Sequence, residues 1–327
     1  MTSLAPIAVD AMGGDFAPNQ IVAGARLAVE RDQCNVILVG NPDLMGDYGN
    51  IEVIPASEVV EMGAEPASAV RRLKDSSIVR GAEAVRDGRA SALLSAGNTG
   101  AAMAASLLRM GRIKGVSRPA IACPYPVRGS TPSMVLDCGA NAECQPEWFP
   151  QFALLGVTYV RAGYNVATPR VAVLTIGEEA GKGNNLVKSA CELLEAFDWE
   201  SVGATYVGNV EGRDLMAGVA DVIVTDGFTG NVVLKSLEGG FSIFQDAVDE
   251  ALRSIGRYDD VGPTLNAVYD GYNPALVGSA VLLGTRGVTL ISHGSSNADT
   301  IAHAIATAQE VASLELVGKV REVFATR

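Results

Sequence analysis

Seven polar, glycine-containing loops recur along the chain, and their residue types suit the binding of an anionic oxygen group. Glycine lets the backbone approach a ligand closely, while Asn and Thr donate hydrogen bonds without adding charge. A single loop of this kind is an ordinary turn, but seven of them gathered round one cleft favour a nest of donors for an anion. The loops are Asp10–Asp15, Ser95–Ala101, Leu136–Asn141, Ile176–Asn184, Gly208–Asp214, Thr225–Asn231 and His293–Asn297.

Two familiar nucleotide-binding motifs are disfavoured. The segment Gly177–Lys182 resembles a P-loop, but three residues rather than four separate its glycines. Gly183 also stands where a Ser or Thr would hold Mg²⁺. No G-x-G-x-x-G fingerprint follows an expected strand. A nucleoside triphosphate site and a Rossmann-type NAD site are therefore not expected.

Side chains that could catalyse a reaction are few. There is no G-x-S-x-G nucleophile elbow. Cys138 follows an expected strand, but no histidine is near in sequence, and we interpret it as a small buried hydrophobe. His293 lies in a glycine and serine loop and is the functional candidate, whereas His303 on the last helix is structural or exposed. Lys182 is either a surface lysine or a clamp for an anion or oxyanion.

The elements that must present these loops follow a strand, loop, helix repeat. This repeat predicts an α/β protein with a mostly parallel sheet, in which ligands bind at the carboxyl ends of the strands. We expect strands at 7–9, 36–39, 51–54, 92–94, 120–123, 133–136, 171–174, 205–207, 222–225 and 288–291. Helices are expected at 21–29, twice within 67–86, and at 101–108, 146–162, 186–197, 232–252 and from 298. Residues 256–278 form the most irregular segment.

Composition excludes several classes of protein. The chain has 327 residues with 25 Lys and Arg against 37 Asp and Glu, a net charge of −12, which disfavours nucleic acid as a partner. Five cysteines without a C-x-x-C pair and only two histidines predict free thiols and no metal site. No secretory signal and no run of about 20 apolar residues are found, so we expect a cytoplasmic protein without a spanning helix.

Taken in order, the loop sequences DAMGGD, SAGNTGA, LDCGAN, IGEEAGKGN, GNVEGRD, DGFTGNVVLK and HGSSNA resemble the PlsX family. The members of this family are phosphate acyltransferases of bacterial phospholipid synthesis. The resemblance runs from Ala8 to about Ile305 and implies a three-layer α/β/α fold, similar to isocitrate and isopropylmalate dehydrogenases and to phosphotransacetylases. It implies one domain over 1–327, with an irregular helical segment at about 241–278 projecting for dimer or membrane contact.

The resemblance also implies a reaction and partners. A long-chain acyl group leaves the thioester of acyl carrier protein and is taken by inorganic phosphate, without a cofactor. A membrane glycerol-3-phosphate acyltransferase then uses the acyl phosphate. A homodimer loosely attached to the inner face of the membrane is expected. The alternatives are a short-chain phosphotransacylase acting on acyl-coenzyme A, a dehydrogenase of similar fold, for which no metal-binding carboxylate set is found, and a membrane scaffold for lipid synthesis.

In this chemistry phosphate is the nucleophile, so the resemblance assigns positioning and electrostatic roles to the loops. Lys182 and Asn231 polarise the thioester carbonyl or hold phosphate, and Asn98 with Thr99 cradles phosphate. His293 protonates the departing thiolate or binds phosphate. The full set of expected substrate contacts is Asp10, Gly13, Gly14, Gly97, Asn98, Thr99, Gly100, Asp137, Asn141, Gly177, Asn209, Asp226, Gly227 and Ser295.

Two surfaces depart from the family pattern or add to it. The segment 277–284 lacks the family's proline, and Arg253 and Arg257 are the only cations between Val248 and Leu283. The apolar residues nearby pack in a core or dimer interface, or dock on a membrane; they are Phe241, Ile243, Phe244, Val248, Leu252 and Ile255. An acidic carrier protein needs a local basic site. The candidates for this site are Arg109, Arg112, Lys114 and Arg118, with Arg71, Arg72 and Lys74 as a second cluster and a solvated helix end as the alternative.

Overall fold

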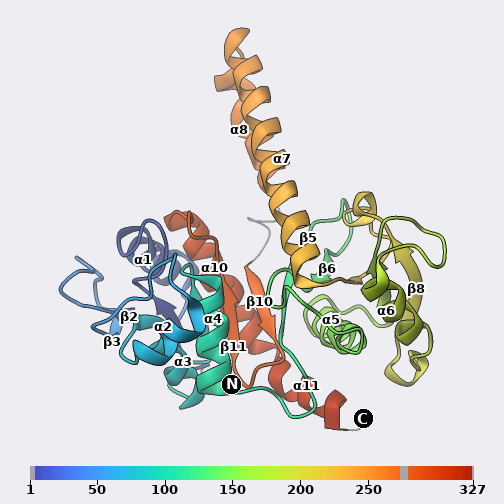
Figure 1. Ribbon diagram of the computed structural model, residues 1–327. Coiled ribbons are helices and arrows are strands. Elements are labelled where there is room, and N and C mark those ends of the chain that lie inside the picture. The colour runs from blue at the N-terminus through green and yellow to red at the C-terminus, as the bar shows by residue number, and fades with distance from the viewer. Residues whose placement is uncertain (1–3, 273–278, 326–327) are drawn as a thin grey trace. The chain divides into compact units, whose positions relative to one another are not determined.

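The computed structural model describes residues 4–272 and 279–325, which divide into two compact units (Figure 1). Unit 1 combines Met1–Pro119 with Ser279–Arg327, so both ends of the chain belong to it. Unit 2 is the continuous segment Ala120–Gly278. Each unit is built round its own set of strands and its own candidate loops.

The sheet of unit 1 runs in the order β3 (Glu52–Pro55), β2 (Val36–Gly40), β1 (Ile7–Asp10), β4 (Ala92–Ser95), β11 (Val288–Ile291) and β10 (Ala280–Leu283). All neighbouring pairs are parallel except β10 with β11. Strands β1, β2, β4 and β11 are buried along their whole length, as expected for parallel strands covered on both faces.

Helices enclose this sheet. Helix α1 (Asn19–Asp32) packs closely against α10 (Ala298–Ser313). Gly24 makes this approach possible, because a Cβ at this position would lie 2.6 Å from the Ile301 side chain. Helix α3 (Ser77–Arg86) lies on β1, β2 and β4. Helix α2 (Pro66–Arg72) packs on α4 (Thr99–Ala105), which continues into a π-helical turn at Ser106–Met110. The last helix is α11 (Leu316–Ala325).

Unit 2 has the strand order β5 (Ala120–Tyr125), β6 (Ser133–Leu136), β9 (Val222–Val224), β7 (Arg170–Leu174) and β8 (Thr205–Val210). Strands β6, β9, β7 and β8 are parallel, and β5 is antiparallel to β6. Helix α5 (Trp148–Tyr164) packs on β6 and β9, and α6 (Asn185–Glu195) follows β7. Short 3₁₀ turns lie at Glu200–Val202 and Gly212–Asp214.

A helical hairpin of α7 (Gly227–Ser254) and α8 (Tyr258–Asp270) completes unit 2 (Figure 1). Polar side chains join the two helices, since the Gln245 amide donates to Asn266 at 3.1 Å. None of the six apolar residues expected to pack or dock here is buried in the described chain, and Ile243 is 72% exposed. Ile243, Phe244 and Ile255 are exposed, whereas the other three are half-buried, and the Phe244 ring also meets the Tyr269 ring of α8 edge-on.

The expected α/β class with a mostly parallel sheet is confirmed, and the expected strands and helices are present with small changes at their ends. The pattern missed β10, and it missed α8, which lies where an irregular segment was expected. The final helix divides at Glu315, which has a positive φ of 54°. Residues 273–278 of the expected projecting segment, and 277–278 of the proline-less motif, lie outside the described residues. Among the helices that the structure describes, none combines the length and the apolar character that crossing a membrane requires.

Candidate active site

Three loops of unit 1 meet because their strands β1, β4 and β11 are parallel neighbours whose carboxyl ends share one edge. Asp10 ends β1 and is 3% exposed. Its carboxylate accepts a hydrogen bond from the Ser95 hydroxyl at 2.7 Å, and the same hydroxyl accepts from the Gly97 N–H at 3.0 Å. The Asp10 side chain therefore ties the loop after β4 to the end of β1.

The two glycines of these loops are required by close approach. A Cβ on Gly13 would lie 2.5 Å from the Asp10 carboxylate and 3.0 Å from the Gly97 backbone. The loops after β1 and β4 therefore touch through their backbones, a close approach that glycine permits.

A small polar cavity of about 10 Å³, room for a single water, lies behind these loops. Asp10, Ser77 and Ser95 line it. Burial raises the pKa of Asp10, while hydrogen bonds from Ser77, Ser95 and the backbone of Met12 and Gly13 act in the opposite direction. Sequence reasoning missed Ser77 and Ser95 as partners of Asp10, because neither stands in a recognisable motif with it.

Asn98 is committed to the fold. Its carbonyl oxygen caps α4 by accepting from the Ala101 N–H at 2.9 Å, and its amide donates to the Met62 carbonyl at 2.7 Å. Thr99 is exposed in the first turn of α4, and Gly100 allows that turn to approach Pro66. The Asn98 side chain is therefore already satisfied, whereas the Thr99 side chain is exposed.

His293 and Ser295 form an exposed pair after β11. The Ser295 N–H donates to His293 Nδ1 at 3.3 Å, and the Ser295 hydroxyl lies 2.7 Å from the same nitrogen. These two contacts orient the imidazole ring through Nδ1. The neighbouring Gly294 carbonyl accepts from the Asp15 N–H at 2.8 Å, which joins this loop to the loop of Gly14.

In unit 2, Asp137 organises the loop after β6. Its carboxylate is fully buried and accepts from the N–H groups of Ile121, Gly139, Ala140 and Asn141 and from the Asn141 amide, at 2.7–3.1 Å. Burial raises the pKa of Asp137, and these hydrogen bonds oppose the rise. Asp137 and Asn141 thus build the loop and have little capacity left for a ligand.

Helix α7 begins directly on that loop. Asp226 caps it by accepting from the Thr229 N–H at 2.8 Å, and the Gly227 N–H donates to the Asn141 carbonyl at 2.9 Å. A Cβ on Gly230 would lie 2.0 Å from the Asp137 carbonyl oxygen, so only glycine permits this contact. The turn carries Asn231, which is exposed and lies beside Gly139. Its amide has no hydrogen-bond partner among the described residues.

Lys182 lies in the loop after β7, the strand next to β9 in the sheet. Its side chain is 50% exposed, and its ammonium is 3.8 Å from the Glu179 carboxylate. Asn209 of β8 braces the loop by donating to the Glu179 carbonyl at 3.0 Å, and Gly177 lets the loop fold close to the Lys182 side chain. Lys182 therefore follows β7, and Asn231, in the first turns of α7, follows the neighbouring strand β9. Gly177 and Asn209 support the loop of Lys182.

These groups donate hydrogen bonds and positive charge but supply no activated nucleophile. Cys138 is buried, and burial raises the pKa of its thiol. This agrees with the prediction that Cys138 is a small buried hydrophobic residue. Among the described residues no cluster of His, Cys, Asp and Glu could hold a metal ion. Of the expected carrier-docking cations, Arg112, Lys114 and Arg118 are exposed and Arg109 is half-buried. Donors and positive charge of this kind are suited to an anion or to negative charge that develops on oxygen.

Solved structures with the same fold include phosphotransacetylases. EutD phosphotransacetylase from Staphylococcus aureus superposes with a TM-score of 0.60 at 18% identity, covering 94% of each chain. A phosphotransacetylase from Streptococcus pyogenes has a TM-score of 0.61 at 16% identity and covers 95% of each chain. Identities this low show the fold alone, and they confirm the expected likeness to this fold class.

Sequence relatives are much closer. The phosphate acyltransferase of Pelotomaculum thermopropionicum is 44% identical over 328 residues, covering 96% of this chain and 94% of that protein. The phosphate acyltransferase of Dictyoglomus turgidum is 40% identical, covering 97% and 96%. A family model described as "Fatty acid synthesis protein" matches residues 5–319. The chain belongs to the PlsX family of phosphate acyltransferases, as its loops predicted, and is an acyltransferase.

Proposed function

We propose that this enzyme transfers a long-chain fatty acyl group from the thioester of acyl carrier protein to inorganic phosphate. The observation that carries the proposal is that Lys182, after β7, and Asn231, in the first turns of α7 after the neighbouring strand β9, are both exposed. None of the described residues of these two segments is an activated nucleophile. Such a site suits a reaction in which the acceptor itself attacks. The description of the family as a fatty acid synthesis protein supports a fatty acyl substrate.

In the proposed reaction a phosphate oxygen attacks the thioester carbonyl carbon. A carbon–oxygen bond forms, the carbon–sulfur bond breaks, and the thiolate leaves and takes a proton. The products are an acyl phosphate and free carrier thiol. Lys182 and the Asn231 amide stabilise the oxyanion or hold phosphate, and each such donor contributes about 3–4 kcal/mol to transition-state stabilisation. His293, whose ring is oriented by Ser295, either binds phosphate or protonates the thiolate.

The test is phosphate-dependent thiol release. The enzyme is mixed with palmitoyl carrier protein, with and without inorganic phosphate, and the product is trapped with hydroxylamine. We expect release only with phosphate, a trapped acyl hydroxamate, and a loss of about 100-fold or more in kcat for Lys182→Ala. Lys188→Ala is the matched control, because Lys188 is exposed on α6 and outside the candidate loops. Near-normal turnover of Lys182→Ala would contradict its electrostatic role.

A short-chain phosphotransacylase is the second candidate, favoured by the shared fold with phosphotransacetylases. The same assay with acetyl- and palmitoyl-coenzyme A separates the two. Reaction with coenzyme A thioesters and none with carrier thioesters would move the assignment to this class. Silence with both would favour a scaffold for lipid synthesis.

The proposal includes an assembly and a place in the cell. The product is an activated fatty acyl group, and we assign it to a membrane glycerol-3-phosphate acyltransferase. A homodimer in the cytoplasm, loosely attached to the inner face of the membrane, fits this handover. The exposed apolar residues of the α7–α8 hairpin support an interface or membrane contact there, since solvent exposure of Ile243, Phe244 and Ile255 is unfavourable.

A further inference from the structure

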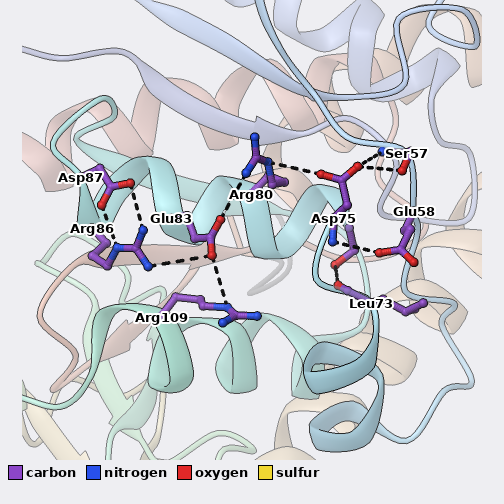
Figure 2. A network of polar contacts seen from close by, with 10 residues as sticks. Ser57, Glu58, Leu73, Asp75, Arg80, Glu83, Arg86, Asp87 and Arg109 are labelled. Carbon is purple, nitrogen blue, oxygen red and sulfur yellow. Dashed lines mark hydrogen bonds and ion pairs between the residues drawn. The ribbon is translucent and has the colours of Figure 1, made fainter.

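The cations expected to dock an acidic carrier protein do not form one group. Figure 2 shows Arg109 turned toward α3, where its Nε lies 3.7 Å from the Glu83 carboxylate. Arg80 and Arg86 approach the same carboxylate at 3.6 Å and 3.9 Å. The side chains of Arg109 and Glu83 are each 23% exposed. Arg109 therefore joins the π-helical turn to α3, and its charge is not presented to a partner.

Arg286, a residue distant in sequence, is held beside the segment that carries Arg112 and Lys114. Arg286 lies in the turn between β10 and β11, and its N–H donates to the Gly111 carbonyl at 2.9 Å. Its Nε donates to the Arg112 carbonyl at 3.0 Å, and the Ile113 N–H donates to the Gly284 carbonyl at 3.0 Å. These bonds fasten the turn to the segment that carries Arg112 and Lys114, so three cations share one rigid surface of unit 1.

We define the basic surface as Arg112, Lys114 and Arg286. All three side chains are exposed, and none forms an ion pair with a described residue. The segments that carry them, Gly111–Pro119 and Gly284–Gly287, contain no Asp or Glu, although the chain as a whole carries −12. Leu108, in the turn just before, is 46% exposed. A concentrated positive surface on an acidic protein favours a partner with a local negative surface.

We propose that the basic surface docks an acidic protein partner through Arg112, Lys114 and Arg286, and that Arg109 takes no direct part. This inference rests on the proposed function for the identity of the partner, which is the carrier protein bearing the acyl thioester. An acidic protein and an anionic lipid both complement this charge, and the lack of a wide apolar face favours the protein. The surface is small and carries a single exposed leucine, whereas the wide apolar face that a bilayer requires is absent among residues 106–119 and 284–287.

The experiment measures KM for palmitoyl carrier protein and Kd for carrier protein without an acyl chain, in the full-length enzyme. We expect Arg286→Glu and Lys114→Glu each to raise both values about tenfold, with the effect shrinking as salt increases. KM for phosphate and turnover of palmitoyl-N-acetylcysteamine, a thioester without a carrier, should change less than about twofold. Lys188→Glu, the reversal of an exposed cation on α6 in the other unit, is the matched control for net charge.

Arg109→Gln separates the new surface from the cluster suggested by sequence. We expect it to lower Tm and to leave KM for the carrier unchanged. A tenfold rise for Arg109→Gln, or an unchanged KM for Arg286→Glu in an enzyme that turns over carrier thioester, would overturn the proposal. Loss of binding to anionic vesicles by Arg286→Glu with normal carrier KM would also overturn it, in favour of lipid. Failure of the wild-type enzyme to use carrier thioester at all would instead refute the proposed function, while direct carrier binding would still test the surface.

Discussion

Two buried carboxylates, Asp10 and Asp137, hold the candidate loops of the two units. Each ends or directly follows a strand, and each is satisfied by hydroxyl, amide or backbone N–H donors rather than by a cation. Hydrogen bonds to a buried carboxylate fix loop geometry strongly, because an unsatisfied buried group costs about 1–3 kcal/mol or more. We therefore regard both as positioning residues, although their place in glycine loops predicted substrate contacts.

The raised pKa of Asp10 gives a pH prediction. The ordinary value is 3.8, and burial raises the pKa in the folded state. The folded state therefore holds the proton more tightly, and its stability falls as pH rises above 3.8 toward the folded pKa. Asp10→Asn lacks this titration, so the free energy of unfolding of wild type minus that of the variant should fall over this range. Urea unfolding at a series of pH values measures it, and a difference that grows with pH would show that the donors outweigh burial.

At the scale of the element, the first turn of α7 is set by contact with the Asp137 loop. Gly230→Ala would place a Cβ 2.0 Å from the Asp137 carbonyl oxygen, so the helix must shift. We expect a loss of about 1–3 kcal/mol in stability from overpacking, and a fall in kcat because Asn231 moves with the turn.

Gly239→Ala in the same helix is the matched control, because no described atom outside its own stretch of helix lies within 4 Å of the place where its Cβ would stand. It should gain up to about 1 kcal/mol from helix propensity with unchanged kcat. Thermal unfolding and steady-state kinetics of both variants give the comparison. Equal behaviour of the two variants would mean that the contact with the Asp137 loop does not position Asn231.

The sequence predicted most elements because apolar runs and helical periods alternate cleanly along the chain. It missed α8 because Gly262 and Pro263 interrupt the pattern, although Asp259 and Asp260 favour a helix start. It missed β10, whose antiparallel pairing with β11 breaks the strand, loop, helix rhythm.

The site was predictable loop by loop from glycine and polar residues, and the family followed from their order. Two kinds of fact could not be predicted from the sequence. One is which polar side chains form hydrogen bonds within the fold and so are not free for a ligand, as in Asn98 and Asn209, whose partners come from distant loops. The other is which cations share a surface, since Arg286 is 174 residues from Arg112 and meets it only through the fold.

At the scale of the whole molecule, the α7–α8 hairpin exposes the apolar side chains of Ile243 and Phe244, and the Phe244 ring also meets the Tyr269 ring of α8 edge-on. If the surface of Ile243 and Phe244 forms the dimer, Ile243→Ser with Phe244→Ser should weaken self-association about tenfold or more. Leu44→Ser, another exposed apolar residue, is the control. Sedimentation velocity over a concentration series measures the change. An unaltered dimer would show that this face is not the dimer interface, and vesicle flotation would then test membrane contact.

The chain order of unit 1 has a consequence for synthesis on the ribosome. Strands β1 to β4 emerge early, but β11, which fills the place beside β4, and α10, which covers α1, are made only after the whole of unit 2. Unit 2 is continuous and can complete its fold first. During that interval the edge of β4 is unpaired and the face of α1 that later contacts α10 is uncovered. Unpaired strand edges favour mispairing. A nascent chain stalled before residue 288 should therefore bind chaperones through its earliest segment. The order in which the segments are synthesised, rather than their final stability, determines which part of this protein is most prone to mispairing.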